Sequence, residues 1–157
     1  MRKRIITTEA QQVPDTTHSW LDIDQLAQIE ISSEDPDAPI ESAINDDTDK
    51  GWRASAPGEQ VIRLLFDTPL ALRCIRLLFV EHDRPRTQEF VLKWSPDAGM
   101  NWHDIARQQY NFSPPDTVSE LEDYRVELDG VSALELRIVP EISGGDARAS
   151  LAQLRIG

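Results

Sequence analysis

Most of the chain after its first third alternates hydrophobic and polar positions over short runs, as β-strands with one buried face do. In the run 89–95, for example, Phe90, Leu92 and Trp94 fall on one side of the expected strand and Lys93 on the other. The pattern predicts strands at 29–31, 60–66, 71–81, 89–95, 102–110, 124–128, 134–138 and 152–156.

Turn-forming residues separate these runs, and no long stretch has the spacing of a helix. This arrangement predicts an all-β fold, an antiparallel β-sandwich. Seven or eight strands in about 130 residues suit either a jelly roll or an immunoglobulin-like sandwich. The immunoglobulin core disulfide needs two cysteines, and the chain has only Cys74. We therefore expect a jelly roll of about eight strands, with Cys74 buried as a small apolar residue.

The length of 157 residues fits one domain. Residues 1–18 carry no periodic apolar pattern, so we expect a partly ordered N-terminal arm followed by a single β-sandwich domain at 19–157. The basic start Met1–Arg4 is not followed by the apolar run of a signal peptide, and no apolar run approaches the ~20 residues of a membrane span. We expect a cytoplasmic protein without a membrane partner.

The charge is concentrated in one part of the sequence. The chain has 16 basic and 28 acidic residues, which gives a formal net charge of −12. Residues 5–49 contain 12 of the acidic residues and no lysine or arginine. Surfaces that follow phosphates need clustered lysine and arginine, so the composition argues against general nucleic-acid binding. The composition does not exclude an anionic ligand that binds at a local basic loop.

Templates for catalysis are incomplete throughout the sequence. There is no glycine-rich phosphate loop and no Gly-x-Ser-x-Gly elbow. The three histidines, His18, His82 and His103, share no metal-ligand spacing. Carboxylates are so numerous that no pair stands out as a catalytic acid and base. We expect no enzymatic activity, no catalytic residues, no metal site and no cofactor.

The loop Asn45–Gly51 is rich in aspartate, which makes it the obvious calcium candidate. It departs from the EF-hand pattern, because Lys50 stands where glycine is required and Ala56 where glutamate is required. We favour a solvated loop whose aspartates accept backbone amides, and calcium binding stays open.

The segment Ser95–Trp102 fits a tight hairpin pattern, Ser-x-Asp-x-Gly-x-x-Trp. We expect Asp97 to accept backbone amides across the turn, Gly99 to supply a positive φ, and Trp102 to pack back over the hairpin. This motif predicts local structure and no activity.

The segment Glu81–Thr87 joins two predicted strands and concentrates His82, Arg84 and Arg86. Arginine forks recognise carboxylates, phosphates and sugar hydroxyls, and a proline within the loop would stiffen it. The same residues also suit a solvated loop that pairs with the acidic first third of the chain. Both interpretations stay open.

Several segments, taken together, resemble coagulation factor 5/8 type C (discoidin) domains. Residues 42–55 and 60–66 are similar to the opening loop and strand of that family, residues 90–102 to its middle strand and turn, and residues 152–157 to its terminal strand. The resemblance spans about residues 28–157. It implies a galactose-binding-like jelly roll that binds sugars, lipid head groups or proteins through loops at one end, without catalysis.

Many sugar-binding members of that family hold a structural calcium ion beside the first loop. The resemblance puts the family's loop aspartate at Asn45, its loop threonine at Lys50 and its terminal-strand glutamate at Gln153. Only Asp47 keeps a carboxylate, and fewer carboxylates with an added ammonium attract a divalent cation less. Our hypothesis is a metal-independent loop in which Lys50 pairs with Asp47 or Asp49.

We expect a non-catalytic binding module, with a carbohydrate or another small polar molecule as its ligand. Arg84 and Arg86 would donate hydrogen bonds to the ligand, His82 would assist, and Trp52 would form an apolar wall. The alternative is an intracellular protein-interaction or scaffold domain of the same fold, whose partner would be a protein. An unrecognised enzyme ranks third.

Overall fold

Two strands of 21 residues, β3 (Gln60–Val80) and β6 (Ser119–Val139), form the frame of the protein. The computed structural model describes residues 20–45 and 51–157. The other elements, in chain order, are α2 (Ile23–Leu26), β1 (Ala27–Ile31), α3 (Glu41–Ile44), β2 (Trp52–Arg53), β4 (Arg86–Ser95), β5 (His103–Phe112), β7 (Ser150–Leu151) and β8 (Gln153–Ile156).

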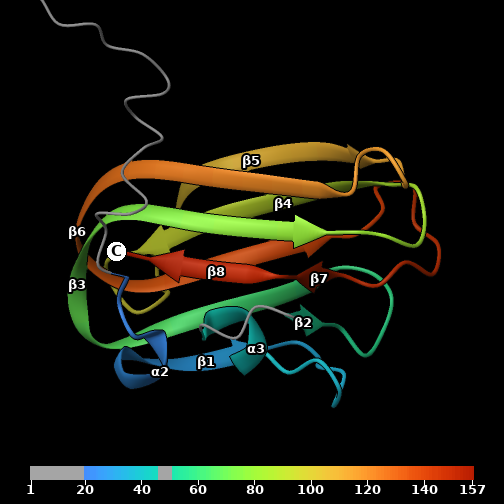
Figure 1. The fold of residues 1–157 in the computed structure, drawn as a ribbon. Helices are drawn as coiled ribbons and strands as arrows, with labels where there is room; N and C mark the ends of the chain where they lie inside the picture. Colours follow the sequence, from blue (N-terminus) through green and yellow to red (C-terminus); the bar gives the residue numbers. More distant parts are fainter. Residues whose placement is uncertain (1–19, 46–50) are drawn as a thin grey trace, which may run out of the picture.

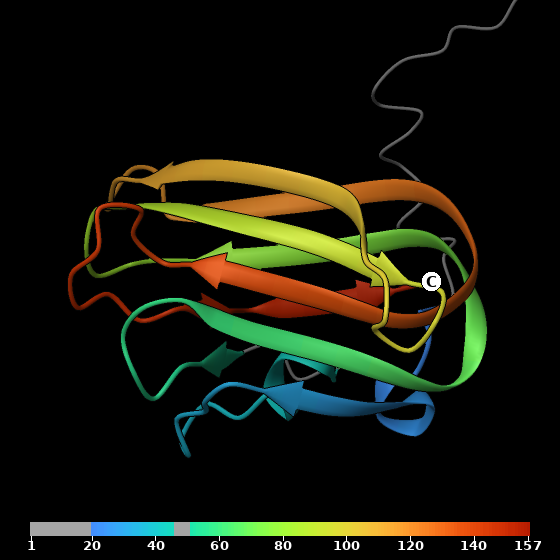
Figure 2. The same cartoon turned by 180° about the vertical axis from the view of Figure 1, so that it is seen from behind.

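Each long strand bends and takes part in both layers of a sandwich (Figures 1 and 2). The first half of β3 pairs with β1 and with the second half of β6, which continues to β4 and then β5. The second half of β3 pairs with β8 and with the first half of β6. Strands β2 and β7 form a separate ladder, and all these pairings are antiparallel. The prediction of an antiparallel jelly-roll sandwich with about eight strands is confirmed.

The bends explain a difference from the predicted strands. The sequence pattern predicts two strands on either side of Asp67–Pro69, whereas the structure has one strand, β3, that turns there. The pairing register against β6 shifts between Leu65 and Cys74, and such irregularities let a ladder continue around a corner. Strand β6 likewise runs through Gly130, which has a φ of 64°. These turn-forming residues therefore mark corners inside strands.

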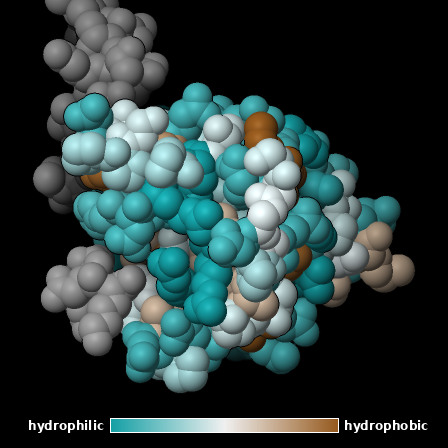
Figure 3. Space-filling view, turned by 90° about the vertical axis from the view of Figure 1, so that its right-hand side faces the viewer, coloured by the Kyte–Doolittle hydropathy of each residue, from teal (hydrophilic) through white to brown (hydrophobic). Residues whose placement is uncertain are grey.

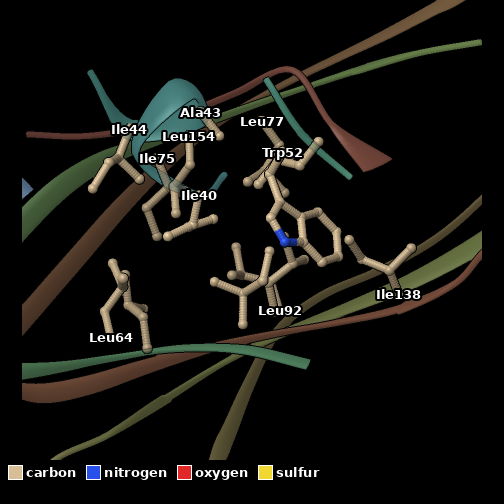
Figure 4. Packing of buried hydrophobic residues seen from close by; sticks show 14 of the residues in the cluster. Ile40, Ala43, Ile44, Trp52, Leu64, Ile75, Leu77, Leu92, Ile138 and Leu154 are labelled. Carbon is tan, nitrogen blue, oxygen red and sulfur yellow. The ribbon is translucent and has the colours of Figure 1, made fainter. Parts of the chain in front are cut away.

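The core lies between the two layers and is built from alternate positions of the strands. Ile62 and Leu64 of β3 cluster with Phe90 and Leu92 of β4, as the alternation predicts. Figure 4 shows the indole of Trp52 within this core, near Leu92 and Ile138. Full burial of a large apolar side chain stabilises a fold by roughly 1.5–3 kcal/mol, so the burial of many such side chains stabilises the sandwich.

The hairpin Ser95–Trp102 has the local structure that the sequence predicts. The Asp97 carboxylate accepts the backbone amide of Asn101 at 2.8 Å and the Ser95 hydroxyl at 2.7 Å. Gly99 has a φ of 91°, and a Cβ added there would lie 3.3 Å from the Trp102 ring. The side-chain amide of Asn101, which donates to the other carboxylate oxygen at 2.6 Å, and these two hydrogen bonds hold the pKa of Asp97 below its usual range. The motif is structural, as expected.

Some of the sequence-based expectations concern single residues or the first part of the chain. Cys74 is buried in β3, as predicted. Within the described ranges, no helix has the length and apolar character needed to cross a membrane. The predicted arm at 1–18 and the predicted pairing of Lys50 with Asp47 or Asp49 lie outside the described residues. The division into an arm and a domain at 19–157 therefore stays a prediction.

Candidate functional site

Several loops meet at one end of the sandwich, on the right in Figure 1. They are the connections 54–59 between β2 and β3, 81–85 between β3 and β4, and 140–149 between β6 and β7. Figure 3 faces this end and shows a mostly hydrophilic surface. Loops on a rigid sheet framework are where binding residues concentrate, so we expect a binding site at this end.

A pocket of about 420 Å³ lies at this end. Its lining comes from β2, from the end of β3 with the loop that follows it, from β7 with the residue after it, and from one residue of the β1–α3 connection. The lining residues are Ala38, Trp52, Arg53, Val80, Glu81, His82, Asp83, Ser150, Leu151 and Ala152. The short ladder pairs Trp52 with Leu151, and the Ala152 amide donates to the Leu78 carbonyl at 2.8 Å. These contacts hold three segments, distant in sequence, around one cavity.

Gly51 allows the close approach of β2 to β7. It has a φ of 68°, and a Cβ added there would lie 2.5 Å from the Leu151 carbonyl oxygen. Any other residue would therefore clash with the β7 backbone and strain its own backbone. The glycine thus sets the position of Trp52 in the pocket wall.

Trp52 lines the pocket from beneath. Its side chain is in the core, the residue is 1% exposed, and its indole Nε1 donates to the Ser33 carbonyl at 3.0 Å. The expectation of an aromatic wall open to a ligand is therefore corrected, because the ring is covered by core residues. Trp52 shapes the pocket by filling the space behind it.

Arg86 also differs from the expectation of a ligand donor. Its side chain is 1% exposed and lies inside the sandwich, where Nε donates to Glu81 Oε1 at 2.6 Å. Nη1 donates to Gln88 Oε1 at 3.0 Å and to the Pro140 carbonyl at 2.9 Å, and the guanidinium lies 4.8 Å from the Phe112 ring centre. Because β4 begins at Arg86 and turns this side chain inward, the guanidinium serves the fold in this structure.

Glu81 links the buried pair to the loop. Its second oxygen accepts the backbone amide of Asp83 at 2.9 Å. Burial raises the pKa of Glu81, but the hydrogen bonds from Arg86 and from Asp83 outweigh burial and hold the pKa below its usual range. An ionised Glu81 therefore closes the turn that carries His82 and Asp83 into the pocket.

His82 and Arg84 are the two predicted residues that the structure places at the surface. His82 is exposed and lines the pocket. Arg84 has a side chain that is 49% exposed, and it pairs with Asp146 of the 140–149 loop at 2.9 Å. This hydrogen bond holds the pKa of Asp146 below its usual range. Arg84 therefore lies beside the pocket and not in its lining, and a ligand role for either residue stays a prediction.

Sequence reasoning missed Arg53, which lines the pocket from β2. Among the residues that the structure describes, its guanidinium makes no hydrogen bond or ion pair, so its donors are available to a ligand. The two-residue strand β2 is too short to show an alternation. The only local signal for Arg53 is its position next to Trp52. Because side chains alternate along a strand, the neighbour of a tryptophan that points into the core points the opposite way.

A second concave surface of about 230 Å³ lies over β4, β5 and β6. Its arginines are already paired, because Arg107 contacts Glu89 at 2.8 Å and Arg137 contacts Glu59 at 2.9 Å. The described part of the chain holds no group of three or more His, Cys, Asp or Glu side chains placed to bind a metal ion. The pocket of about 420 Å³ at the loop end of the sandwich, the loop-end pocket, is therefore the better candidate for a small ligand.

Comparison with solved structures finds the same fold in several carbohydrate-binding modules. The chain is similar to CpGH89CBM32-5 from Clostridium perfringens, solved in complex with GalNAc-β-1,3-galactose, with 18% identity and a TM-score of 0.65 over 88% of this chain and 99% of the other. It is similar to the family 32 module of NanJ from C. perfringens, in complex with galactose, with 12% identity and a TM-score of 0.64 over 87% and 96%. The corresponding module of AlyQ, in complex with 4,5-unsaturated mannuronic acid, has 16% identity and a TM-score of 0.57 over 89% and 98%.

No protein-family model matches the chain, and no curated protein matches its sequence. At these identities the likeness to solved structures shows the fold. The fold found by comparison is the galactose-binding-like jelly roll that the sequence predicts.

Proposed function

We propose that this protein is a non-catalytic carbohydrate-binding module whose ligand occupies the loop-end pocket. The observation that carries the proposal is the pocket itself, where Arg53, whose guanidinium has no partner among the described residues, lies in one lining with His82 and Asp83. A volume of about 420 Å³ falls within the ~300–1,000 Å³ of small-molecule sites. The ligands of the similar modules, galactose, a GalNAc-galactose disaccharide and a uronic acid derivative, support the choice of ligand class.

The chemistry of the lining suits sugar hydroxyls. Arg53 supplies a fork of donors, His82 supplies a donor or an acceptor, and the carboxylate of Asp83 accepts. The charges of Arg53 and Asp83 offset each other, and Arg86 offsets Glu81. A lining without net charge accommodates a neutral sugar, which hydrogen-bonds through both donors and acceptors.

Two carboxyl groups, those of Glu81 and Asp83, lie in the pocket lining, and that of Glu81 is committed to the fold. Glycosidases of the common kind use two carboxyl groups, one of them as an acid and the other as a base or nucleophile. Glu81 is held by Arg86 and by the Asp83 amide, so its oxygens are occupied. This occupation supports binding without catalysis. Arg84, with Asp146, would extend the site at its edge.

Replacing Arg53 should weaken sugar binding without harming the fold. We expect Arg53→Ala to raise the Kd for a bound sugar about 10-fold to 100-fold, because a charged donor is lost. Isothermal titration calorimetry with galactose, GalNAc and galacturonic acid measures this effect. Asp83→Asn, which keeps one acceptor oxygen but removes the charge, tests whether the sugar needs the carboxylate.

The matched control is Arg107→Ala, which removes an exposed arginine from the sheet surface outside the pocket. We expect this variant to bind sugar like the wild type. Absence of saturable binding of any of these sugars by the wild type would reject the proposed function. Equal loss of affinity in the two arginine variants would reject the loop-end pocket as the site.

A further inference from the structure

The strand β8 carries an arginine whose charge is buried against backbone carbonyl groups. Arg155 is 7% exposed. Its Nη2 donates to the Asn45 carbonyl at 2.7 Å, and its Nη1 donates to the Ala43 carbonyl at 3.3 Å. Ala43 lies in the short helix α3, and Asn45 is the residue that caps its C-terminal end. A single guanidinium therefore joins the end of α3 to β8.

The surroundings of Arg155 explain why it turns toward these carbonyls. Its partner across the ladder is Arg76 of β3, and like charges in directly opposed positions repel. Arg76 is neutralised by two hydrogen bonds to Asp123, at 2.8 and 2.9 Å. The C-terminal end of a helix carries partial negative charge on its free carbonyls, which attract a cation.

The same place is where the family resemblance implies a calcium ion. The resemblance puts a loop ligand at Asn45 and a terminal-strand carboxylate at Gln153, and Gln153 and Arg155 lie on the same side of β8 because side chains alternate. In this protein, that side of β8 carries the neutral amide of Gln153 and the guanidinium of Arg155. The guanidinium hydrogen bonds occupy carbonyl oxygens and its charge repels a divalent ion, so these residues do not fit calcium.

We propose that the guanidinium of Arg155 is a built-in replacement for a structural metal ion. It holds the end of α3, where the 45–51 loop begins, against β8, so that this part of the fold needs no divalent cation. This inference does not depend on the identity of the ligand in the loop-end pocket. It assigns to Arg155, which donates to the Ala43 and Asn45 carbonyls, the role that the sequence suggested for Lys50.

Thermal unfolding of the wild type and of Arg155 variants tests the proposal. For the wild type we expect the same Tm in EDTA and in millimolar CaCl₂, and no binding of calcium by calorimetry. We expect Arg155→Met to lower Tm by about 3–10 °C, because two carbonyls lose a charged donor. Arg155→Lys keeps the charge but loses the forked pair of donors. We expect its Tm to lie between those of the wild type and Arg155→Met.

A local measurement separates this role from a general loss of stability. Hydrogen exchange of the Ile44 and Asn45 amides, which donate to Ile40 and Glu41, should accelerate about tenfold or more in Arg155→Lys, a variant expected to fold. The control is Arg73→Met, since Arg73 also donates to two carbonyls but is half exposed. That variant should leave exchange at Ile44 and Asn45 unchanged.

Two results would overturn the proposal. One is saturable binding of calcium to the wild type with a rise in Tm of several degrees. The other is unchanged amide exchange at Ile44 and Asn45 in both Arg155 variants, with a Tm no lower than that of Arg73→Met. If the wild type binds no sugar, the proposed function fails but this proposal is unaffected. Thermal unfolding, calcium binding and amide exchange are all measured without a sugar.

Discussion

Replacing Arg86 by methionine is expected to lower the free energy of unfolding by about 3–5 kcal/mol, the range found when one partner of a buried ion pair is removed. The variant keeps the volume of the aliphatic part of the side chain but leaves the Glu81 carboxylate buried without its partner. Gln88 and the Pro140 carbonyl lose a donor, and the contact of the cation with the Phe112 ring is lost. Denaturation by urea at neutral pH measures the effect.

Two further variants show whether the buried charge causes the loss. The double variant Glu81→Gln/Arg86→Met has no unpaired charge, so we expect it to be more stable than Arg86→Met alone. Arg107→Met removes a similar pair with Glu89 at a side chain that is 60% exposed, and we expect a loss of about 0–1 kcal/mol. An Arg86→Met variant as stable as Arg107→Met would contradict the role of Arg86.

The buried pair also has a pH dependence with a defined sign. The pKa of Glu81 lies below its usual range in the folded protein, so its contribution is present above the unfolded pKa. It is lost as the pH falls through the folded value. In Arg86→Met the carboxyl no longer has this partner and protonates more readily. The difference in the free energy of unfolding between this variant and the wild type should therefore become smaller at acidic pH.

Replacing Glu120 by glutamine is expected to stabilise the protein at pH 8 and to leave it nearly unchanged at pH 4. Burial, and then the charge of Glu122, raise the pKa of Glu120 to about 7, although Gln88 and Arg86 lower it. A carboxyl with a raised folded pKa contributes stability that is full below the unfolded pKa and is lost as the pH rises through 7.

The size of the Glu120 effect follows from the pKa. A rise from 4.5 to about 7, at about 1.4 kcal/mol for each pKa unit, makes the ionised form cost up to about 3 kcal/mol above pH 8. Glutamine removes this cost and keeps an oxygen for Gln88 Nε2, which lies 3.4 Å from the Glu120 carboxylate. Urea denaturation at both pH values, with NMR titration of the carboxyl, measures the change.

Glu127→Gln is the control for Glu120→Gln, because Glu127 is exposed on the same strand. We expect no appreciable change in stability for this variant at either pH. If Glu120→Gln changes stability equally at pH 4 and pH 8, the carboxyl does not titrate near neutrality and the prediction is wrong.

Alternation of apolar and polar residues predicted the sandwich because the strand period is a local property. The residues that make the Ser95–Trp102 hairpin lie close together in sequence, so the turn was predicted together with the backbone amide that Asp97 accepts. The same local reasoning treated Arg84 and Arg86 alike. They differ because Arg84 lies in a loop and pairs at the surface, whereas Arg86 opens β4 with its side chain inward.

The amino-acid sequence by itself determined most of the strand segments and their order, apart from the short β2 and β7, and a concentration of polar residues in the loop after β3. Only the tertiary structure decided which of those residues reach the surface. A charged side chain turns inward only where distant segments supply its partners, as Glu81 and Pro140 do for Arg86. Likewise Arg155 meets Asn45, 110 positions earlier, and Arg53 enters a pocket through the pairing of β2 with β7. Such long-range pairings depend on the packing of the whole sandwich, and no local pattern encodes them.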